Sequence, residues 1–412
     1  MSAGTDGEEA PIATVKCRSN TLEYSAERRK SLRSRYVYGF IFFLMNLTTW
    51  FIRDYGHNVF QNELFVRFCG PAPGGGCFHK MGVLRLSLGC FIFFLLMFLT
   101  TCQTSKLQEA RNTWHSNWWL FKFVLLIITL VLPFFCPPSL IHLYGELARV
   151  GAGVFLLLQL VSVIQFMTMV NNYWMSDATL NGSCCLGLFM SIVFYIGSVC
   201  GIALMYLLYA PTLSCTINIF FISWTVILII AMTVLTIHSK VRCLLSSGIM
   251  ASYIVYLCWS AIRSEPKNNK CSPKHDGSGD GDWTTVLAFL IAICAVVMAT
   301  FSTGIDSQSF QFQKEEVQHE EDIPYKYGFF HLVFSLGSMY FAMLFISWQL
   351  LDHPAAKRWS IDVGSTSTWV KIINVSFAAI IYVWKLILPV TRQNKVMSDQ
   401  DKPMNNSTNI IP

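Results

Sequence analysis

Charged side chains are scarce in this sequence of 412 residues, where they make up 13% of the chain, against about 25% in an average soluble protein. Hydrophobic residues make up 53%, and the mean hydropathy is +0.47. So few charges argue against a soluble enzyme, a DNA-binding protein and a secreted disulfide scaffold. The composition predicts an integral membrane protein.

Sequence motifs for catalysis and nucleotide binding are also lacking. No G-x-x-x-x-G-K-[ST] phosphate cradle is present, which argues against an ATP-driven pump. The nine histidines show neither H-E-x-x-H nor metal-type spacing, and there is no G-x-S-x-G elbow. Residues 276–281 match the start of a calcium loop, but the twelfth position holds Leu287 where a bidentate Glu belongs. We therefore predict a linker there, no metal or other cofactor, and no enzyme activity.

Long apolar runs are what the sequence has instead. A helix that spans the bilayer needs about 20 apolar residues. Ten candidate spans lie near 36–52, 81–101, 118–136, 147–170, 186–209, 217–237, 244–262, 283–301, 327–350 and 369–390. The sequence thus predicts an all-α integral membrane protein with ten transmembrane helices. The span at 244–262 is the most polar, so we expect it to be buried among the others.

Basic residues in the segments between spans predict the orientation. Residues 1–35 form a basic tail that precedes the first span, while 36–390 form the membrane domain and 391–412 a second tail. The bias of Lys and Arg places both termini in the cytoplasm. It leaves 53–80 and 263–282 as outer loops and 302–326 as an acidic cytoplasmic loop. That acidic run is either a solvated face or a handle for trafficking adaptors.

Cysteines on the expected outer side suggest a disulfide. Cys69 and Cys77 bracket the flexible turn 70–76 and are a candidate pair. Free thiols, or bridges to the other outward cysteines, are the alternatives; these are Cys136, Cys215 and Cys271. The adjacent Cys184 and Cys185 are interpreted as small apolar filler rather than acylation sites.

Polar side chains inside a bilayer are costly unless they are paired or hydrated. Glu146 and Arg149 share a helix face and form either a salt bridge or the lining of a polar path. For Lys122, Lys371 and Lys385 the favoured interpretation is that the side chains reach the headgroups. The candidates for an intramembrane polar site or lipid groove are Glu146, Arg149, Gln159, Gln165, Ser252, Tyr253, His331, Lys371 and Asn374.

The fourth span lies within an unusually long predicted helix. Residues 143–174 contain no proline and no strong turn signal, which corresponds to about 48 Å of helix. Because the hydrocarbon core is only about 30 Å thick, such a helix must tilt or project. Small residues at Gly151, Gly153, Gly197 and Gly201 are expected to allow close helix packing.

Several motifs in order along the chain resemble those of the serine incorporator (SERINC) family of multipass membrane proteins. They are residues 82–87 (GVLRLS), 118–122 (WWLFK), 246–261 (SSGIMASYIVYLCWSA), 327–334 (YGFFHLVF) and 367–372 (STWVKI). The resemblance covers about residues 35–390. One departure is Gln165, which stands where the family tends to carry an acidic residue late in the fourth span.

The resemblance implies two helical bundles joined by a long diagonal fourth helix. It also implies residence in the plasma membrane and the Golgi and ER membranes, and ATP-independent scrambling of phospholipids, phosphatidylserine included. An alternative is a serine carrier or scaffold for phosphatidylserine and sphingolipid biosynthesis. The expected partners are membrane phospholipids, with lipid-synthesis enzymes, trafficking adaptors and a second copy of the chain as further candidates, and no nucleic acid.

Overall fold

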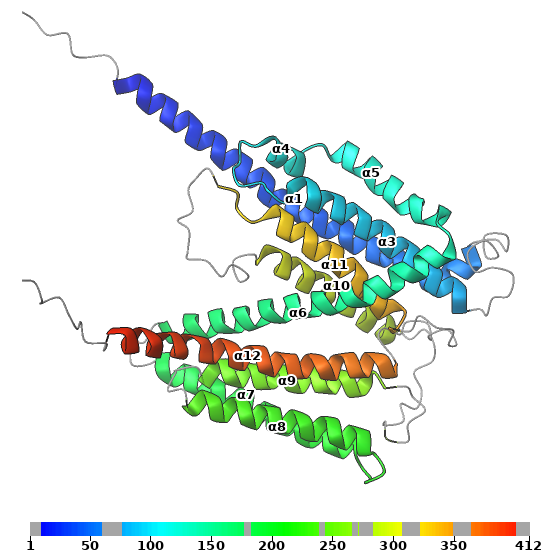
Figure 1. Ribbon diagram of the computed structural model, residues 1–412, viewed down its shortest axis with the longest axis vertical. Coiled ribbons are helices and arrows are strands. Elements are labelled where there is room, and N and C mark those ends of the chain that lie inside the picture. Colours follow the sequence, from blue (N-terminus) through cyan, green and yellow to red (C-terminus); the bar gives the residue numbers. More distant parts are fainter. Residues whose placement is uncertain are drawn as a thin grey trace, which may run out of the picture. The chain divides into compact units, whose positions relative to one another are not determined.

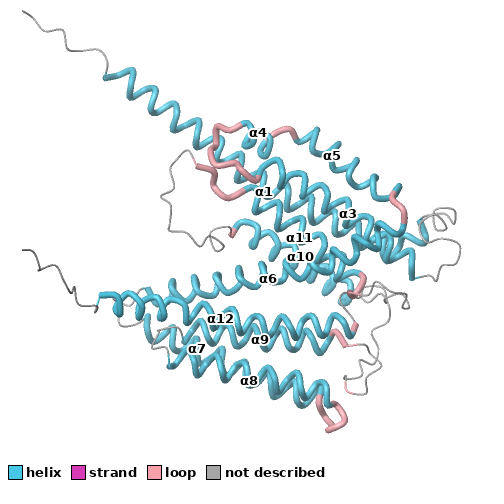
Figure 2. Tube along the Cα trace, viewed as in Figure 1, coloured by secondary structure: helices cyan, strands magenta, loops and turns pink. Residues whose placement is uncertain are grey.

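The computed structural model describes residues 10–59, 76–176, 183–238, 244–265, 271, 283–306, 322–348 and 364–400. The elements are α1 (Ala10–Val59), α3 (Gly76–Thr101), α4 (Ala110–Ser116), α5 (Trp119–Val131), the 3₁₀ helix η1 (Leu132–Phe135), α6 (Pro138–Ser176), α7 (Ser183–Tyr209), α8 (Thr216–His238), α9 (Leu244–Arg263), α10 (Trp283–Ile305), α11 (Tyr327–Phe345) and α12 (Ser365–Gln400) (Figure 1). Within these ranges short loops join the helices, and the only β-type pairing is one isolated bridge (Figure 2).

Every one of the ten predicted spans falls largely on a helix. This is expected, because a backbone in lipid must satisfy its hydrogen bonds within the segment. In the described part of the chain, seven helices are long and apolar enough to cross a membrane, or eight if the bent pair of α4 with α5 and η1 forms one span. The all-α multipass membrane fold is confirmed, whereas the count of ten stays a prediction. The additional predicted spans fall on α1 and α10, where only Phe289–Ile305 qualifies as a shorter apolar helix.

Helix boundaries differ from the predicted loops at several points. Helix α1 runs on to Val59, so the outer loop expected from residue 53 begins later. The predicted third span starts at a bend, because Trp118, whose backbone has a φ of 61°, separates α4 from α5 and the two helices meet at 71°. Pro133 accompanies the tightening of the helix end into η1.

The chain divides into two compact units. The first contains residues 1–162 and 275–366, and the second contains 163–274 and 367–412. Helix α6 contributes its first part to one unit and its last part to the other. Its 39 residues confirm the long helix that was predicted over 143–174.

Aromatic rings fill the core of the first unit, where α3 packs on α11 and α1 packs on α3. The Phe42 ring lies 5.8 Å from that of Phe94 and 4.9 Å from that of Phe334, and all three side chains are fully buried. Such ring pairs add about 0.5–1.5 kcal/mol beyond the area that they bury.

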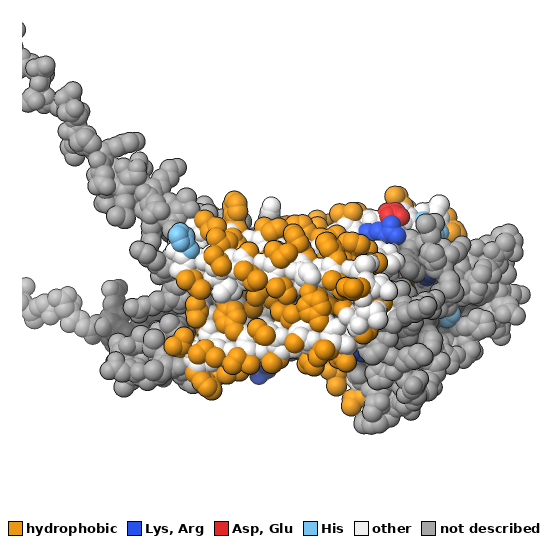
Figure 3. All heavy atoms as spheres, turned by 90° about the horizontal axis from the view of Figure 1, so that it is seen from below, with side chains coloured by type: hydrophobic (Ala, Val, Ile, Leu, Met, Phe, Trp, Pro, Cys, Tyr) orange, Lys and Arg blue, Asp and Glu red, His pale blue; other side chains and the backbone are white. Residues whose placement is uncertain are grey.

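Helices α7 and α9 pack together in the second unit. The apolar stretch of α9 is 61% buried, whereas that of α7 is only 17% buried. The prediction that 244–262 lies among other helices is therefore confirmed. Helix α7 instead exposes large apolar side chains such as Phe189, Ile196 and Leu207. Figure 3 shows one face of the molecule, on which apolar side chains predominate.

Two of the four glycines predicted to allow close packing do so. A Cβ atom at Gly201 would lie 2.9 Å from Val255 Cγ1, and one at Gly151 would collide with Met339 Sδ. Gly153 and Gly197 have no such neighbour within 4 Å among the described residues. Only Gly201 of the Gly197–Gly201 pair therefore contributes to the α7–α9 interface.

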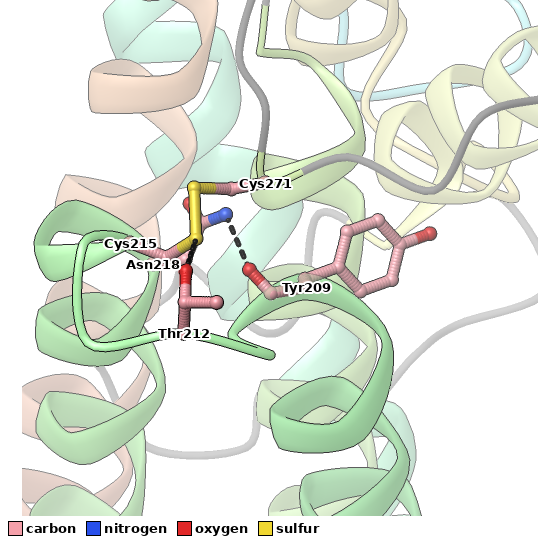
Figure 4. The surroundings of a disulfide bond; sticks show 5 residues. All are labelled: Tyr209, Thr212, Cys215, Asn218 and Cys271. Carbon is pink, nitrogen blue, oxygen red and sulfur yellow. Dashed lines mark hydrogen bonds between the residues drawn. A yellow bond between two sulfur atoms is a disulfide. The ribbon is translucent and has the colours of Figure 1, made fainter.

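A disulfide joins Cys215, in the turn between α7 and α8, to Cys271 beyond α9 (Figure 4). Asn218 Nδ2 donates a 2.9 Å hydrogen bond to the Tyr209 carbonyl across the same turn. Both cysteines belong to the predicted outward set. The predicted partner pair lies outside the described residues, because Cys69 and the Cys77 side chain are not described.

Candidate functional site

Helix α12 carries a polar stripe on one face. Lys371, Asn374, Tyr382 and Lys385 follow one another at intervals of three, eight and three residues, with Ala378 completing the helical repeat. Residues at this spacing share a face. The two lysines are about 21 Å apart along the helix axis at 1.5 Å per residue.

Neighbouring helices hold both lysines at the ends of this stripe. Lys371 Nζ donates to Ser264 Oγ at 2.5 Å and to the Ser260 carbonyl of α9 at 3.4 Å. Lys385 Nζ donates to Gln165 Oε1 of α6. Both lysines are half-buried. Their side chains are thus directed to helix interfaces, and the prediction that they reach the headgroups stays a prediction.

The electrostatics of the second unit favour anions. Among its described side chains, two lysines, Lys371 and Lys385, lie in the largely apolar helix α12. The one carboxylate among them is that of Glu265, just beyond α9. Positive charge that exceeds negative charge in a low-dielectric setting attracts anionic groups.

An apolar cavity of about 540 Å³ lies between α8 and α12. Its lining residues are Leu228, Ala231, Met232, Ala379, Ile380, Val383, Trp384 and Ile387. From the helical period, the α12 members lie roughly opposite the polar stripe. Because its side chains offer almost no polar group, the cavity suits hydrocarbon.

A seam of hydroxyl groups joins α7 to α9 and contains one predicted site residue. Ser252 Oγ lies 3.1 Å from Ser198 Oγ and also donates to the Phe194 carbonyl. The Tyr195 hydroxyl lies 2.9 Å from Ser247 Oγ. The side chain of Tyr253, at the next position of α9, makes no hydrogen bond with the described residues. The seam satisfies the serines of α9 against another helix, so packing accounts for them.

Glu146 and Arg149 form the salt bridge that was one of the two predictions for them. Arg149 Nη1 lies 3.0 Å from Glu146 Oε2, and Arg149 Nη2 donates to the Trp348 carbonyl at 3.2 Å. The side chains are 37% and 62% exposed for Arg149 and Glu146. Arg149 therefore also fixes the backbone after α11, where Trp348 has a φ of 61°.

His331 belongs to a buried network that brings together α1, α4 and α11. His331 Nε2 lies 3.1 Å from His115 Nδ1, and His115 Nε2 lies 2.9 Å from the Tyr325 hydroxyl. Because the Tyr325 hydroxyl donates to the Ser31 carbonyl, His115 Nε2 must donate to Tyr325 and His331 Nε2 must donate to His115. His331 Nδ1 is then an acceptor, and it has no partner in the described structure.

Lys122 does not reach toward headgroups as predicted. Its side chain is only 1% exposed, its Nζ donates to the His115 carbonyl at 2.8 Å, and it lies 4.2 Å from the Trp119 ring centroid. The rings of Tyr38 and Trp114 are within 6 Å of the same ammonium. The snorkelling interpretation of Lys122 is therefore wrong, because cation–π contacts replace water around the charge.

A buried ion pair near the end of α1 was not predicted. Arg53 Nε donates to Asp54 Oδ1 at 2.6 Å, and Trp50 Nε1 donates to Asp54 Oδ2 at 2.8 Å. Sequence reasoning assigned Arg53 to an outer loop. The sequence did carry a signal for this pair, because Arg53 and Asp54 are adjacent, opposite in charge and directly follow an apolar run. Charges at the end of a span have the lowest free-energy cost when they are paired.

The predicted site residues divide between the two units. Gln165, Ser252, Tyr253, Lys371 and Asn374 belong to the second unit. Glu146, Arg149, Gln159 and His331 belong to the first. The side chains of Gln159 and Asn374 make no hydrogen bond with the described residues. The structure brings Lys371 and Asn374 onto one face of α12, extends that face to Tyr382 and Lys385, and places Ser260 and Ser264 against Lys371.

The described side chains contain no group of three or more His, Cys, Asp or Glu that could hold a metal ion. The fold and its polar groups define an all-α multipass membrane protein with polar side chains gathered at helix interfaces. Over residues 12–322 and 306–395 the sequence matches the family described as Serine incorporator (Serinc). The chain belongs to the serine incorporator family, as its motifs indicated.

Similar proteins carry the same description. A probable serine incorporator of Nematostella vectensis is 28% identical over 75% of this chain and 78% of its own length. Serine incorporator 3 of Bos taurus is 25% identical over 77% of this chain and 80% of its own length. A probable serine incorporator of Dictyostelium discoideum is 25% identical over 89% and 96%, respectively.

Proposed function

We propose that this protein moves phospholipids, phosphatidylserine among them, between the two leaflets of a membrane without ATP. The observation that carries the proposal is the polar stripe of α12. Lys371 and Lys385 lie on one face, about 21 Å apart along the axis, in a span that is otherwise largely apolar. That separation covers most of the hydrocarbon core, which is about 30 Å thick.

A headgroup that crosses a bilayer needs polar contacts along its route, because an unsatisfied polar group in hydrocarbon costs several kcal/mol. The stripe supplies ammonium groups at both ends and an amide and a phenol between them. The amide is that of Asn374 and the phenol that of Tyr382. The acyl chains need only an apolar surface, which the exposed side chains of α7 and α8 provide.

The role of the lysines is tested in proteoliposomes that contain a fluorescent phosphatidylserine or phosphatidylcholine. Each removed charge is expected to weaken attraction for an anionic headgroup by about fivefold. The Lys371→Met/Lys385→Met variant should therefore slow the movement of phosphatidylserine more than that of phosphatidylcholine. The Lys371→Arg/Lys385→Arg variant should move the two lipids at the same relative rates as the wild type. Arg263→Gln, at the end of α9, is the matched control. Equal slowing of both lipids would contradict an electrostatic role.

A serine carrier or scaffold for phosphatidylserine and sphingolipid synthesis is the second candidate, and the relatives' printed name, serine incorporator, supports only its serine part. It predicts uptake of labelled serine into proteoliposomes or co-purification with a lipid-synthesis enzyme. Transporter sites often lie at broken helices. In the second unit, which carries the stripe, α7, α8 and α9 are each continuous, and the bend between α4 and α5 belongs to the first unit. The polar stripe favours the lipid route.

We also propose the orientation with both termini in the cytoplasm. The disulfide from Cys215 to Cys271 supports it, because disulfides persist in the lumen of the secretory pathway and outside the cell. The α7–α8 turn then faces that side. Ser264 lies directly after α9, on the side of the chain that leads to Cys271. Because Lys371, near the start of α12, bonds to Ser264, the start of α12 lies on the side of the disulfide, and α12 would end on the cytoplasmic side. Residence in the plasma membrane or in Golgi and ER membranes fits this chemistry.

A further inference from the structure

The N-terminal half of α1 carries a cationic surface outside the site described above. Arg28, Arg29, Lys30 and Arg33 are exposed, and α1 continues from them without interruption into the expected span at 36–52. Because the helix is continuous, the position of these side chains relative to the membrane is set by the span itself.

Contacts on the opposite face fix the direction in which this surface points. Ser31 Oγ lies 2.7 Å from the Tyr327 hydroxyl, Ser34 Oγ donates to the Ser116 carbonyl, and the Tyr38 hydroxyl donates to the His115 carbonyl. Ser31, Ser34 and Tyr38 are all buried. Arg29 and Arg33 therefore point away from the packed interior of the first unit.

The same outward face changes from cationic to apolar between Arg33 and Tyr36. Tyr36 is 58% exposed and Phe40 is 59% exposed, and the next turn presents Leu44. Arg35 bridges the change, because its guanidinium lies 4.8 Å from the Tyr36 ring centroid. A switch of this kind indicates the boundary between headgroups and hydrocarbon, where amphipathic rings settle.

Of the cations on this surface, Arg33 lies at headgroup depth, whereas Arg28 and Arg29 lie just outside the headgroup layer, on its aqueous side. Arg33 is about 4.5 Å and Arg29 about 10 Å along the helix from Tyr36, and each headgroup layer is about 5–7 Å thick. Lys30 pairs with Glu27 at 2.6 Å. The guanidinium groups of Arg28 and Arg33 make no hydrogen bond or ion pair with the described residues. Residues 22–35 carry five basic side chains against the two acids Glu23 and Glu27.

We propose that this cationic surface of α1, formed by the outward-facing Arg29 and Arg33 with the exposed Arg28 beside them, binds the headgroups of anionic phospholipids in the adjacent leaflet. Charge complementarity selects the occupant, since basic residues next to a span attract anionic lipid within about a Debye length. The site binds lipid at the rim of the first unit and is separate from the α12 stripe. It requires no transport, so its test is independent of the proposed function.

The test measures lipid association with the full-length protein in vesicles of phosphatidylcholine and phosphatidylserine. Spin-labelled phosphatidylserine and phosphatidylcholine report the fraction of each lipid that the protein immobilises. We expect a preference for phosphatidylserine that falls at least fivefold in the Arg28→Gln/Arg29→Gln/Arg33→Gln variant and shrinks at high salt. The matched variant Arg28→Lys/Arg29→Lys/Arg33→Lys should keep the preference for phosphatidylserine. The variant Glu23→Gln/Glu27→Gln should strengthen that preference.

Two outcomes would overturn the proposal. One is equal association of both lipids with the wild-type protein. The cationic surface would then not select anionic lipid, and an acidic protein or nucleic acid would be its alternative ligand. The other is a preference that survives in the glutamine variant and disappears in Lys371→Met/Lys385→Met, which would locate the selectivity on α12. The melting temperature of each variant shows that the protein measured is folded.

Discussion

Glu146 and Arg149 form an ion pair across one turn of α6, and the same arginine donates to the Trp348 carbonyl. The pair is well exposed, so we expect a coupling of only about 0.3–0.5 kcal/mol. Arg149→Met should destabilise the protein more than Glu146→Gln, because it also removes the donor to Trp348. A double-mutant cycle on thermal stability in detergent measures both quantities. Strictly additive effects would mean that the two side chains act independently.

The two histidines of the buried network should differ in their contribution to stability. His115 bonds to both His331 and Tyr325, and its ring stacks on Tyr327 at 3.9 Å. His331 has one bonded and one unpartnered ring nitrogen. His115→Phe should therefore cost about 1–3 kcal/mol, and His331→Phe should cost less. Melting of the two purified variants decides the order, and a greater loss for His331→Phe would contradict the assigned network.

The disulfide should stabilise the second unit. Cys215 and Cys271 close a loop with a sequence separation of 56 residues, and such bonds typically contribute about 2–4 kcal/mol. Reductant should lower the melting temperature of the wild-type protein and leave that of Cys215→Ser/Cys271→Ser unchanged. Cys200→Ser, which removes an exposed free thiol, is the control and should respond like the wild type. A melting temperature that is insensitive to reductant in both proteins would exclude a stabilising role.

Glu109 should contribute a pH-dependent part of the stability. Burial alone would raise its pKa, but hydrogen bonds from the Lys106 and Ser105 backbone and the Ser105 hydroxyl lower the pKa overall. A carboxyl whose pKa is lower in the folded state stabilises above its unfolded value of about 4.3 and loses this contribution as the pH falls. The melting difference between wild type and Glu109→Gln should shrink from pH 7 to pH 3.5. A constant difference would contradict the assignment.

Sequence patterns predicted the helices because their causes are local. An apolar run must be helical in lipid whatever surrounds it, so all ten predicted stretches fall on helices and α6 is long. The serines of α9 also predicted its burial, because hydroxyl groups in a lipid-facing helix would lack partners. The bend at Trp118 was missed, since a left-handed backbone at tryptophan has no sequence signal.

Pairs of residues that are distant in sequence could not be predicted. His115 and His331 are 216 positions apart, and Gln165 and Lys385 are 220 apart. Lys122 lies near the end of a predicted span, and this position fits both a side chain that extends to the headgroups and one that is buried against other helices. Only the rings of Tyr38, Trp114 and Trp119 around it reveal the buried arrangement.

The most direct test of lipid movement uses the wild-type protein in liposomes that contain fluorescent phosphatidylserine in both leaflets. A membrane-impermeant reductant is added outside in the absence of ATP, and the fluorescence is followed over time. If the protein scrambles lipid, bleaching continues past the share of the outer leaflet in vesicles that contain it. A plateau at that share, equal to the plateau of protein-free vesicles, would contradict the account.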